Sequence, residues 1–209
     1  MEVTLKRNGA ETPRKKGFQS FYSKGEEIFN AVSHIVGGAF GLIAWIVLLI
    51  YSYPNPAAMT GVSVFCACIV LLYTMSALYH FLPSGRAKGV FRIFDHCTIY
   101  LLIAGTYTPY CLIAFAGTAA GIAVLACEWA LAAVGITMNA IAMNKKVVKG
   151  ISMALYLIMG WLALALYPFA AGLMSTLSLL LLLFGGIAYT AGIGFFAFGK
   201  KVPYFHAVW

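Results

Sequence analysis

The side chains of this sequence that could carry out chemistry are few, and most of them lie near the ends of apolar stretches. Imidazole and carboxylate groups can bind a metal ion or transfer a proton. The four histidines are His34, His80, His96 and His206. Acidic residues accompany two of them, since Asp95 directly precedes His96 and Glu27 lies seven residues before His34. The sequence therefore contains the groups needed for a metal site or for acid–base catalysis.

The spacing of these residues places them on common helix faces. Glu27, Asn30 and His34 follow one another at i, i+3 and i+7, and Ser76 and His80 at i and i+4. Residues three or four apart are neighbours on a helix surface. A hydroxyl one turn from a histidine can hydrogen-bond a metal-bound water or orient a ligand. We therefore predict one polar site shared among several helices.

Each of these residues also has a purely structural interpretation. Glu27 fits equally well as an acidic residue at a helix start, facing solvent, and Asn30 could cap that helix. Asp95 could pair with Arg92, and Ser76 could be an ordinary small packing residue. A single histidine near a membrane surface is more often an interfacial residue than a metal ligand. What favours a site is the joint placement of these groups on four helices.

The composition is that of a membrane protein. Apolar residues make up 62% of the chain and charged residues 10%, whereas soluble domains are about half apolar and about a quarter charged. All fourteen lysines and arginines lie in four segments, residues 6–24, 86–92, 145–149 and 200–201, which alternate with uncharged connections. Short loops rich in basic residues stay in the cytoplasm. We therefore predict a multi-pass protein of the inner or plasma membrane with a cytoplasmic N-terminus.

The net charge of +8 follows from this topology and also suits an anionic inner leaflet, so it does not indicate binding to nucleic acid. Membrane lipids are the expected partners. The topology places each histidine near the cytoplasmic end of its helix. Four helices then present polar groups at the same depth of the membrane.

The apolar stretches predict an all-α bundle of the seven-helix type. The expected spans are residues 31–53, 57–81, 90–113, 118–141, 150–170 and 173–198, with a seventh helix starting near Pro203, of which this chain contains only the beginning. About 20 residues are needed to cross the hydrocarbon, and helices satisfy their own backbone groups there. We expect residues 1–22 to form a disordered basic tail and residues 23–209 to form one membrane domain.

Two further features concern cysteines and one glutamate. The five cysteines form no CxxC pair and lie in apolar stretches, so we expect buried thiols rather than disulfides or a metal knot. Glu128 lies midway along the expected fourth helix. A bare carboxylate is costly in a membrane, so this side chain should be protonated or hydrogen-bonded within the bundle.

Four stretches of the chain carry longer motifs. Residues 23–34 read SKGEEIFNAVSH, and residues 76–80 read SALYH, an S-x3-H pattern. Residues 95–109 read DHCTIYLLIAGTYTP, and residues 203–209 read PYFHAVW, which begins an H-x3-H pattern. Over residues 23–209 the chain resembles the bacterial haemolysin III proteins, which belong to the superfamily that includes the progestin and adiponectin receptors.

The resemblance implies a seven-helix bundle with a zinc ion. The implied ligands are His80, His206 and a second histidine of the last helix, one position after Trp209, where this sequence ends. His34 or Asp95 are other candidates for the third ligand. The resemblance also implies that an aspartate at the start of the third helix, here Asp95, holds the metal-bound water.

An open zinc site of this kind suits hydrolysis, since the metal lowers the pKa of its bound water to about 7. We therefore expect a ceramidase-like hydrolase acting on a lipid amide or ester, with Asp95 as general base and Ser76 as a polar helper. The alternatives are a cytolytic, pore-forming protein and a receptor-like regulator of membrane homeostasis without catalysis.

Overall fold

The computed structural model describes residues 18, 20–170, 172–199 and 201–208, and the regular structure in these ranges is helical throughout. The elements in chain order are α1 (Lys24–Ser52), α2 (Pro56–Phe81), α3 (Arg86–Pro109), η1 (Tyr110–Ala114), α4 (Ala119–Ala142), α5 (Lys146–Trp161), η2 (Leu162–Phe169), α6 (Thr176–Phe198) and α7 (Phe205–Val208). Six stretches are long and apolar enough to cross a membrane, with η1 and η2 extending α3 and α5. The prediction of an all-α, multi-pass membrane bundle is confirmed.

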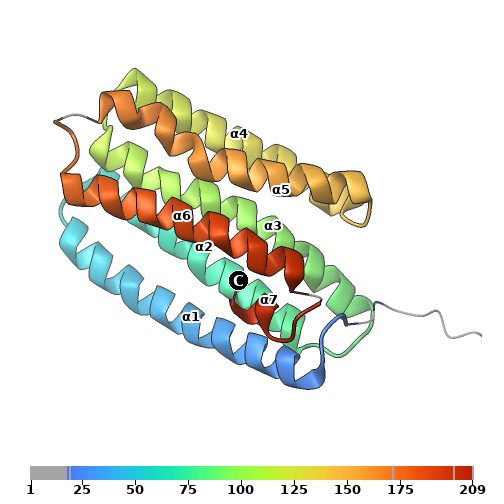
Figure 1. Cartoon of the computed structure of the whole chain (residues 1–209). Coiled ribbons are helices and arrows are strands. Elements are labelled where there is room, and N and C mark those ends of the chain that lie inside the picture. The colour runs from blue at the N-terminus through green and yellow to red at the C-terminus, as the bar shows by residue number, and fades with distance from the viewer. Residues whose placement is uncertain (1–17, 19, 171, 200, 209) are drawn as a thin grey trace, which may run out of the picture.

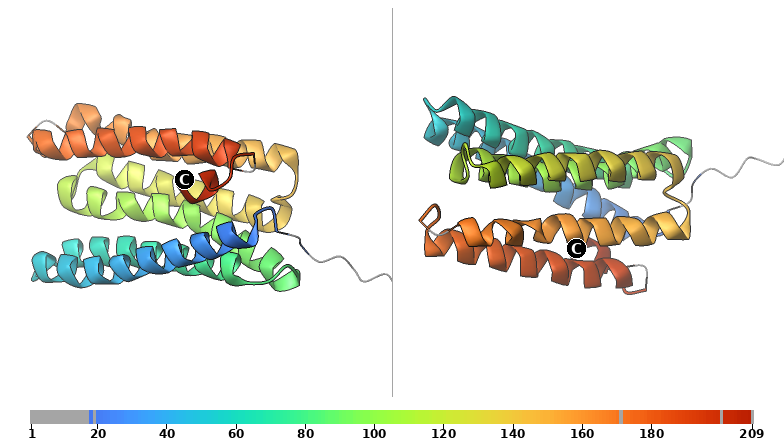
Figure 2. Two further views of the ribbon diagram at one scale, coloured as in Figure 1. Left: turned by 60° about the horizontal axis from the view of Figure 1, so that its bottom comes forward. Right: turned by 90° about the horizontal axis from the view of Figure 1, so that it is seen from above.

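The long helices run side by side, and each connection reverses the direction of the chain (Figures 1 and 2). The start of α1 and the α2–α3, α4–α5 and α6–α7 connections lie at one end of the bundle (Figure 1). The described basic residues belong to this end, and they are Lys24, Arg86, Lys88, Arg92, Lys145, Lys146, Lys149 and Lys201. By the distribution of basic residues, this end is the cytoplasmic one.

The central helix of the bundle is α3. It packs against α2, α4 and α5, and half of its apolar window is buried, compared with none of that of α6. Helix α1 packs mainly on α2, and the short α7 lies against α6 and α1 (Figure 1). Apolar side chains on the outer faces of α1 and α6 are exposed, as lipid-facing residues are expected to be. Side chains on α3 are therefore placed inside the bundle.

Helix α1 begins at Lys24, seven residues before the expected start. Ser23 accepts a hydrogen bond from the backbone N–H of Glu26, and the carboxylate of Glu26 accepts one from the N–H of Ser23. This reciprocal pair is a capping box, which satisfies two amide groups that a helix start leaves unpaired. The interpretation of Asn30 as the cap is wrong, since Asn30 lies inside the helix and is only 1% exposed.

Two helices change their winding inside the membrane. After Pro109, α3 widens into the π-helical η1, and after Trp161, α5 tightens into the 3-10 helix η2. Pro109 removes one backbone donor, which accounts for part of the first change. The expected spans 90–113 and 150–170 reach into these segments, but the sequence analysis did not predict the changes of winding. Both segments form the last turns of their spans, and irregular winding is frequent at helix termini.

The cysteines follow the expectation with one exception. Cys66, Cys68, Cys97 and Cys111 are buried free thiols, but Cys127 is exposed. Helix α4 buries the face that carries Glu128. Consecutive helix residues point about 100° apart, so Cys127 points away from that face and its expected burial is wrong.

The predicted disorder of the N-terminal tail falls mostly on residues 1–17 and 19, which lie outside the described residues. The end of the tail packs against the bundle. The rings of Phe18 and Tyr79 lie 6.4 Å apart, and Phe18 and Phe21 contact the guanidinium of Arg92. Residues 18 and 20–22 therefore border the cytoplasmic end of the bundle.

Candidate functional site

The core of the site is a chain of polar contacts that joins α1, α2 and α3. Nδ1 of His80 lies 2.7 Å from Oε2 of Glu27, and Nζ of Lys88 lies 3.0 Å from Oε1 of the same carboxylate. The side chains of His80 and Lys88 are 0% and 1% exposed, and that of Glu27 is 12% exposed. The alternative in which Glu27 faces solvent is therefore wrong, because its carboxylate holds an imidazole and an ammonium.

Lys88 was not identified from the sequence, although it is buried at the centre of these contacts. Its ammonium donates to the carbonyl oxygens of Tyr79, His80 and Leu82 at 2.7, 3.3 and 3.1 Å. These carbonyls belong to the end of α2, where helix carbonyls lack partners and a cation is favourable. In the sequence Lys88 is one of several basic residues of a cytoplasmic loop, and no local motif distinguishes it from the others.

Replacing Lys88 by methionine is expected to destabilise the bundle by about 2 kcal/mol, because the buried Glu27 carboxylate and the α2 carbonyls lose a charged donor. Thermal unfolding of the detergent-solubilised protein measures this loss. The matched control is Lys146→Met, at an exposed lysine of the same cytoplasmic end, for which we expect a change within about 0.5 kcal/mol. Equal stability of the two variants would show that Lys88 does not hold the carboxylate.

Imidazoles from three helices meet beside this carboxylate. The rings of His80 and His206 lie 5.3 Å apart, and those of His80 and His34 lie 5.7 Å apart, measured between centroids. Because Nδ1 of His80 donates its proton to Glu27, Nε2 carries the lone pair that could bind a metal. Nε2 is buried and has no hydrogen-bond partner among the described residues. A carboxylate on one ring nitrogen is the usual way in which a metal-binding histidine is oriented.

The cluster supplies two of the metal ligands that the resemblance implies, and not a complete set. In the part of the chain that the structure describes, no three histidine, cysteine, aspartate or glutamate side chains lie close enough to hold one ion. His34 and Asp95 are therefore not brought into a three-ligand group with His80 and His206. The donors that are present fit a zinc ion, since His80 offers an oriented nitrogen that is buried and has no hydrogen-bond partner among the described residues.

The remaining predicted residues surround this cluster. Ser76 lies one turn before His80 on α2 and is 4% exposed, and Asn30 places its amide nitrogen 3.5 Å from Nδ1 of His80. Asp95 is buried on α3, and its Oδ2 lies 3.6 Å from Nδ1 of His96.

One predicted detail differs from the structure. Arg92 donates to the side chain of Asn144 at 3.1 Å, and no ion pair between Arg92 and Asp95 is found among the described residues. His96 donates Nδ1–H to the carbonyl of Arg92 at 3.0 Å. The same nitrogen lies 3.6 Å from Oδ2 of Asp95, and His96 lines a pocket together with His206.

Tyr22 was not foreseen as a site residue, and it covers the cluster from the cytoplasmic side. Its ring stacks on that of His206 at 4.5 Å between centroids, with the planes 19° apart. Burial, together with the negative charge of Glu27, raises the pKa of Tyr22 above its usual value, so the phenol is neutral. The hydroxyl of Ser20 donates to the Glu27 carboxylate from the same segment. The end of the tail thus separates the histidines from bulk water.

A pocket of about 230 Å³ borders His206. Its polar and basic lining residues are Tyr22, Arg92, His96, Asn139, Lys149, Ser152 and Tyr156. The wall is held by a buried network, in which Ser152 donates to Asn139 at 2.9 Å and the hydroxyl of Tyr156 donates to the carbonyl of His96 at 3.0 Å. A polar or anionic group beside the histidine cluster would find donors here.

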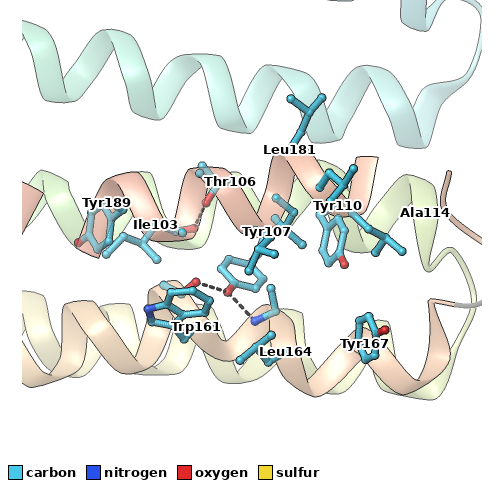
Figure 3. Close-up of a pocket in the computed structure, with 18 of the residues that line it drawn as sticks. Ile103, Thr106, Tyr107, Tyr110, Ala114, Trp161, Leu164, Tyr167, Leu181 and Tyr189 are labelled. Atoms are coloured by element: carbon cyan, nitrogen blue, oxygen red, sulfur yellow. Dashed lines mark hydrogen bonds between the residues drawn. The ribbon is translucent and has the colours of Figure 1, made fainter. Parts of the chain in front are cut away.

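A larger pocket of about 910 Å³ lies further from the cytoplasmic end, between α3, η1, α5, η2 and α6 (Figure 3). Figure 3 shows the side chains of Ile103, Tyr107, Tyr110 and Leu164 lining it. Most of its lining is apolar. The two pockets follow one another along α3, since Ile99 borders the smaller and Ile103, one turn later, borders the larger.

Comparison with known proteins agrees with the motifs. The family described as haemolysin-III related matches residues 22–209. The chain is 36% identical over 187 residues to the hemolysin-3 homolog of Bacillus subtilis (strain 168), a match that covers 88% of this chain and 85% of that protein. It is 38% identical over 187 residues to hemolysin-3 of Bacillus cereus, covering 88% of this chain and 83% of that protein. This chain therefore belongs to the haemolysin III-related family, as its motifs predicted.

Proposed function

We propose that this protein is a zinc-dependent hydrolase of the inner or plasma membrane that acts on a lipid amide or ester. The observation that carries the proposal is the state of His80. Its Nδ1 is held by Glu27, its Nε2 is buried with no partner in the described part of the chain, and its ring lies 5.3 Å from that of His206. A buried polar atom without a partner costs about 1–3 kcal/mol. A bound metal ion would remove that cost.

His80 and His206 would hold the zinc ion in this proposal, and the third ligand would be the histidine that the resemblance implies one turn beyond His206. Glu27 fixes the ring orientation of His80 through Nδ1, so that Nε2 is the nitrogen that would face the metal. Lys88 balances the charge of Glu27, so the carboxylate stays ionised next to the imidazole. These contacts support the proposal because they orient the His80 ring without the help of a metal ion.

Bound zinc would supply a polarised substrate carbonyl and a water of lowered pKa. Side chains of this protein would transfer the proton, orient the reacting groups and exclude water. Asp95 accepts a proton from the attacking water and returns it to the leaving amine or alcohol. Ser76 hydrogen-bonds the reacting groups from one turn before His80. Tyr22 closes the cytoplasmic side, so that competing water is excluded.

The two pockets support a lipid as the substrate. The larger is apolar, lies within the membrane and is of the size that small-molecule sites commonly have. The smaller borders His206 and carries polar and basic groups. If the acyl chain of a lipid lay in the larger pocket and its polar head in the smaller, the amide or ester bond that joins them would lie toward the histidine cluster.

The proposal is tested on protein that contains the complete seventh helix, purified in detergent. Metal content is measured by inductively coupled plasma mass spectrometry, and turnover of ceramides and phospholipids by mass spectrometry. We expect one zinc per chain and release of fatty acid that stops on chelation. Absence of zinc would end the proposal. Leakage of liposomes that is unchanged by chelation, with no lipid turnover, would favour the cytolytic activity that the names of the relatives suggest.

A further inference from the structure

Helix α4 turns one buried face toward α3, and a carboxyl group lies in the middle of it. The buried residues of α4 are Gly121, Val124, Glu128, Ala132, Gly135 and Asn139, which recur every three or four positions. Glu128 is 0% exposed. With a rise of 1.5 Å per residue it lies about 14 Å from the start of α4 and about 21 Å from its end. The group therefore lies inside the hydrocarbon region.

Nothing in its surroundings compensates a negative charge. Neither carboxylate oxygen of Glu128 has a hydrogen-bond partner among the described residues. The lysines and arginines that the structure describes all lie at the cytoplasmic end of the bundle. The adjacent Trp129 donates its indole N–H to Thr108 at 3.2 Å, which fixes the depth of Glu128 relative to α3. An isolated carboxylate in such a place costs many kcal/mol, whereas the neutral acid does not.

The titratable side chains on the elements packed against α4 do not offer a counter-charge. Those near the depth of Glu128 are Tyr107, Tyr110, Cys111 and Tyr167. Those toward the cytoplasmic end are Tyr156, Lys146 and Lys149 of α5 and Arg86, Lys88, Arg92, Asp95, His96, Cys97 and Tyr100 of α3. A charge on Glu128 would act most directly on Tyr107 and Cys111. Both are acids that are neutral in this setting, so neither can neutralise it.

The hydroxyl of Tyr107 is already engaged. It donates to the carbonyl of Met159 at 2.8 Å and accepts from the N–H of Ala163 at 2.7 Å, at the point where α5 tightens into η2. Figure 3 shows the Tyr107 hydroxyl pointing toward this segment. The changes of winding in α3 and in α5 thus both lie against α4 near this carboxyl. Backbone that departs from α-helix at membrane depth is tolerated where it is buried in protein or lines a cavity.

We propose that Glu128 is a proton-binding site in the interior of the membrane. The carboxyl holds its proton while α3 and α4 are packed together, and it releases the proton only when the two helices separate enough to admit water or a cation. Protonation of Glu128 is thereby linked to the packing of the two irregular segments η1 and η2. The site is separate from the histidine cluster and does not depend on its metal.

The test uses two carbodiimides on the purified full chain in nanodiscs. In this reaction the carboxyl O–H adds across one C=N bond and the acyl group then moves to nitrogen, so a stable N-acylurea forms without a further reactant. We expect the lipid-soluble dicyclohexylcarbodiimide to modify Glu128 and to leave Glu26, a carboxylate at the cytoplasmic surface, largely unmodified. A water-soluble carbodiimide should show the reverse order. Peptide mass spectrometry locates the adducts.

Three further readouts make the result decisive. Glu128→Gln should abolish the adduct on α4 and keep the thermal stability of the parent, because glutamine is also neutral. Raising the pH should slow modification of Glu128, since only the protonated acid reacts. The infrared carbonyl band of a protonated carboxylic acid should be present in the parent and absent in Glu128→Gln. Modification of Glu128 by the water-soluble reagent alone, or absence of that infrared band, would overturn the proposal.

Discussion

Replacing His80 by alanine is expected to abolish zinc binding and lipid hydrolysis together, in protein that contains the complete seventh helix. Nε2 of His80 is buried and has no hydrogen-bond partner among the described residues, and the rings of His80 and His206 lie 5.3 Å apart. Its removal takes away one of three ligands and leaves Glu27 without the imidazole that it orients. Loss of a ligand from a structural or catalytic zinc site commonly removes the ion. Metal content per chain and fatty acid release are the measurements.

His96→Ala is the matched control, because it also removes an imidazole at the same depth, but one whose Nδ1 is bound to the backbone of α3. We expect that variant to retain zinc. Glu27→Gln provides a graded comparison, since it keeps an oxygen facing His80 but removes the charge, and a fall of about 10–100-fold in zinc affinity is expected. Zinc retained at full occupancy in His80→Ala with a folded protein would contradict the assignment.

The topology of the bundle could be predicted because it depends on charge and length alone. Basic residues in alternate connections fix which ends of the helices lie together, and Figure 1 places these connections at one end. That reasoning also brought Glu27 and His80 to the same depth. The same reasoning could not predict the contact between Glu27 and His80, because that contact depends on the rotation of α1 about its own axis relative to α2. The approach of His206 to His80, 126 residues earlier in the chain, was predicted only through the family resemblance.

Two site residues could not be predicted from local sequence patterns, because their roles depend on contacts between separate elements. Lys88 acts through its position next to the end of α2, and Tyr22 through a tail that folds back over α7, and both contacts exist only between elements. The helix start at Ser23 is a different case. The S-x-x-E pattern of Ser23 and Glu26 is a local signal that the sequence contained, and it outweighs Asn30 as the cap.

Changing Asp95 to asparagine is expected to lower lipid turnover by about 10²–10⁴-fold while zinc content and thermal stability stay close to those of the parent. Asparagine keeps the size and the hydrogen-bonding capacity of the side chain but cannot accept the proton of the attacking water. Asp95 is buried on α3, and its carboxylate lies 3.6 Å from Nδ1 of His96, an imidazole that could take part in moving the accepted proton. Turnover by mass spectrometry and metal content are measured on the same preparation.

Glu128→Gln is the matched control, because it makes the same carboxylate-to-amide change on α4, a helix that contributes no residue to the histidine cluster, and full turnover is expected. The two possible departures have different meanings. If Asp95→Asn loses zinc as well as turnover, the carboxylate helps to hold the metal and is not a base. If it keeps both, another group transfers the proton. The first candidates are Ser76, one turn before His80 on α2, and His34, whose ring lies beside that of His80.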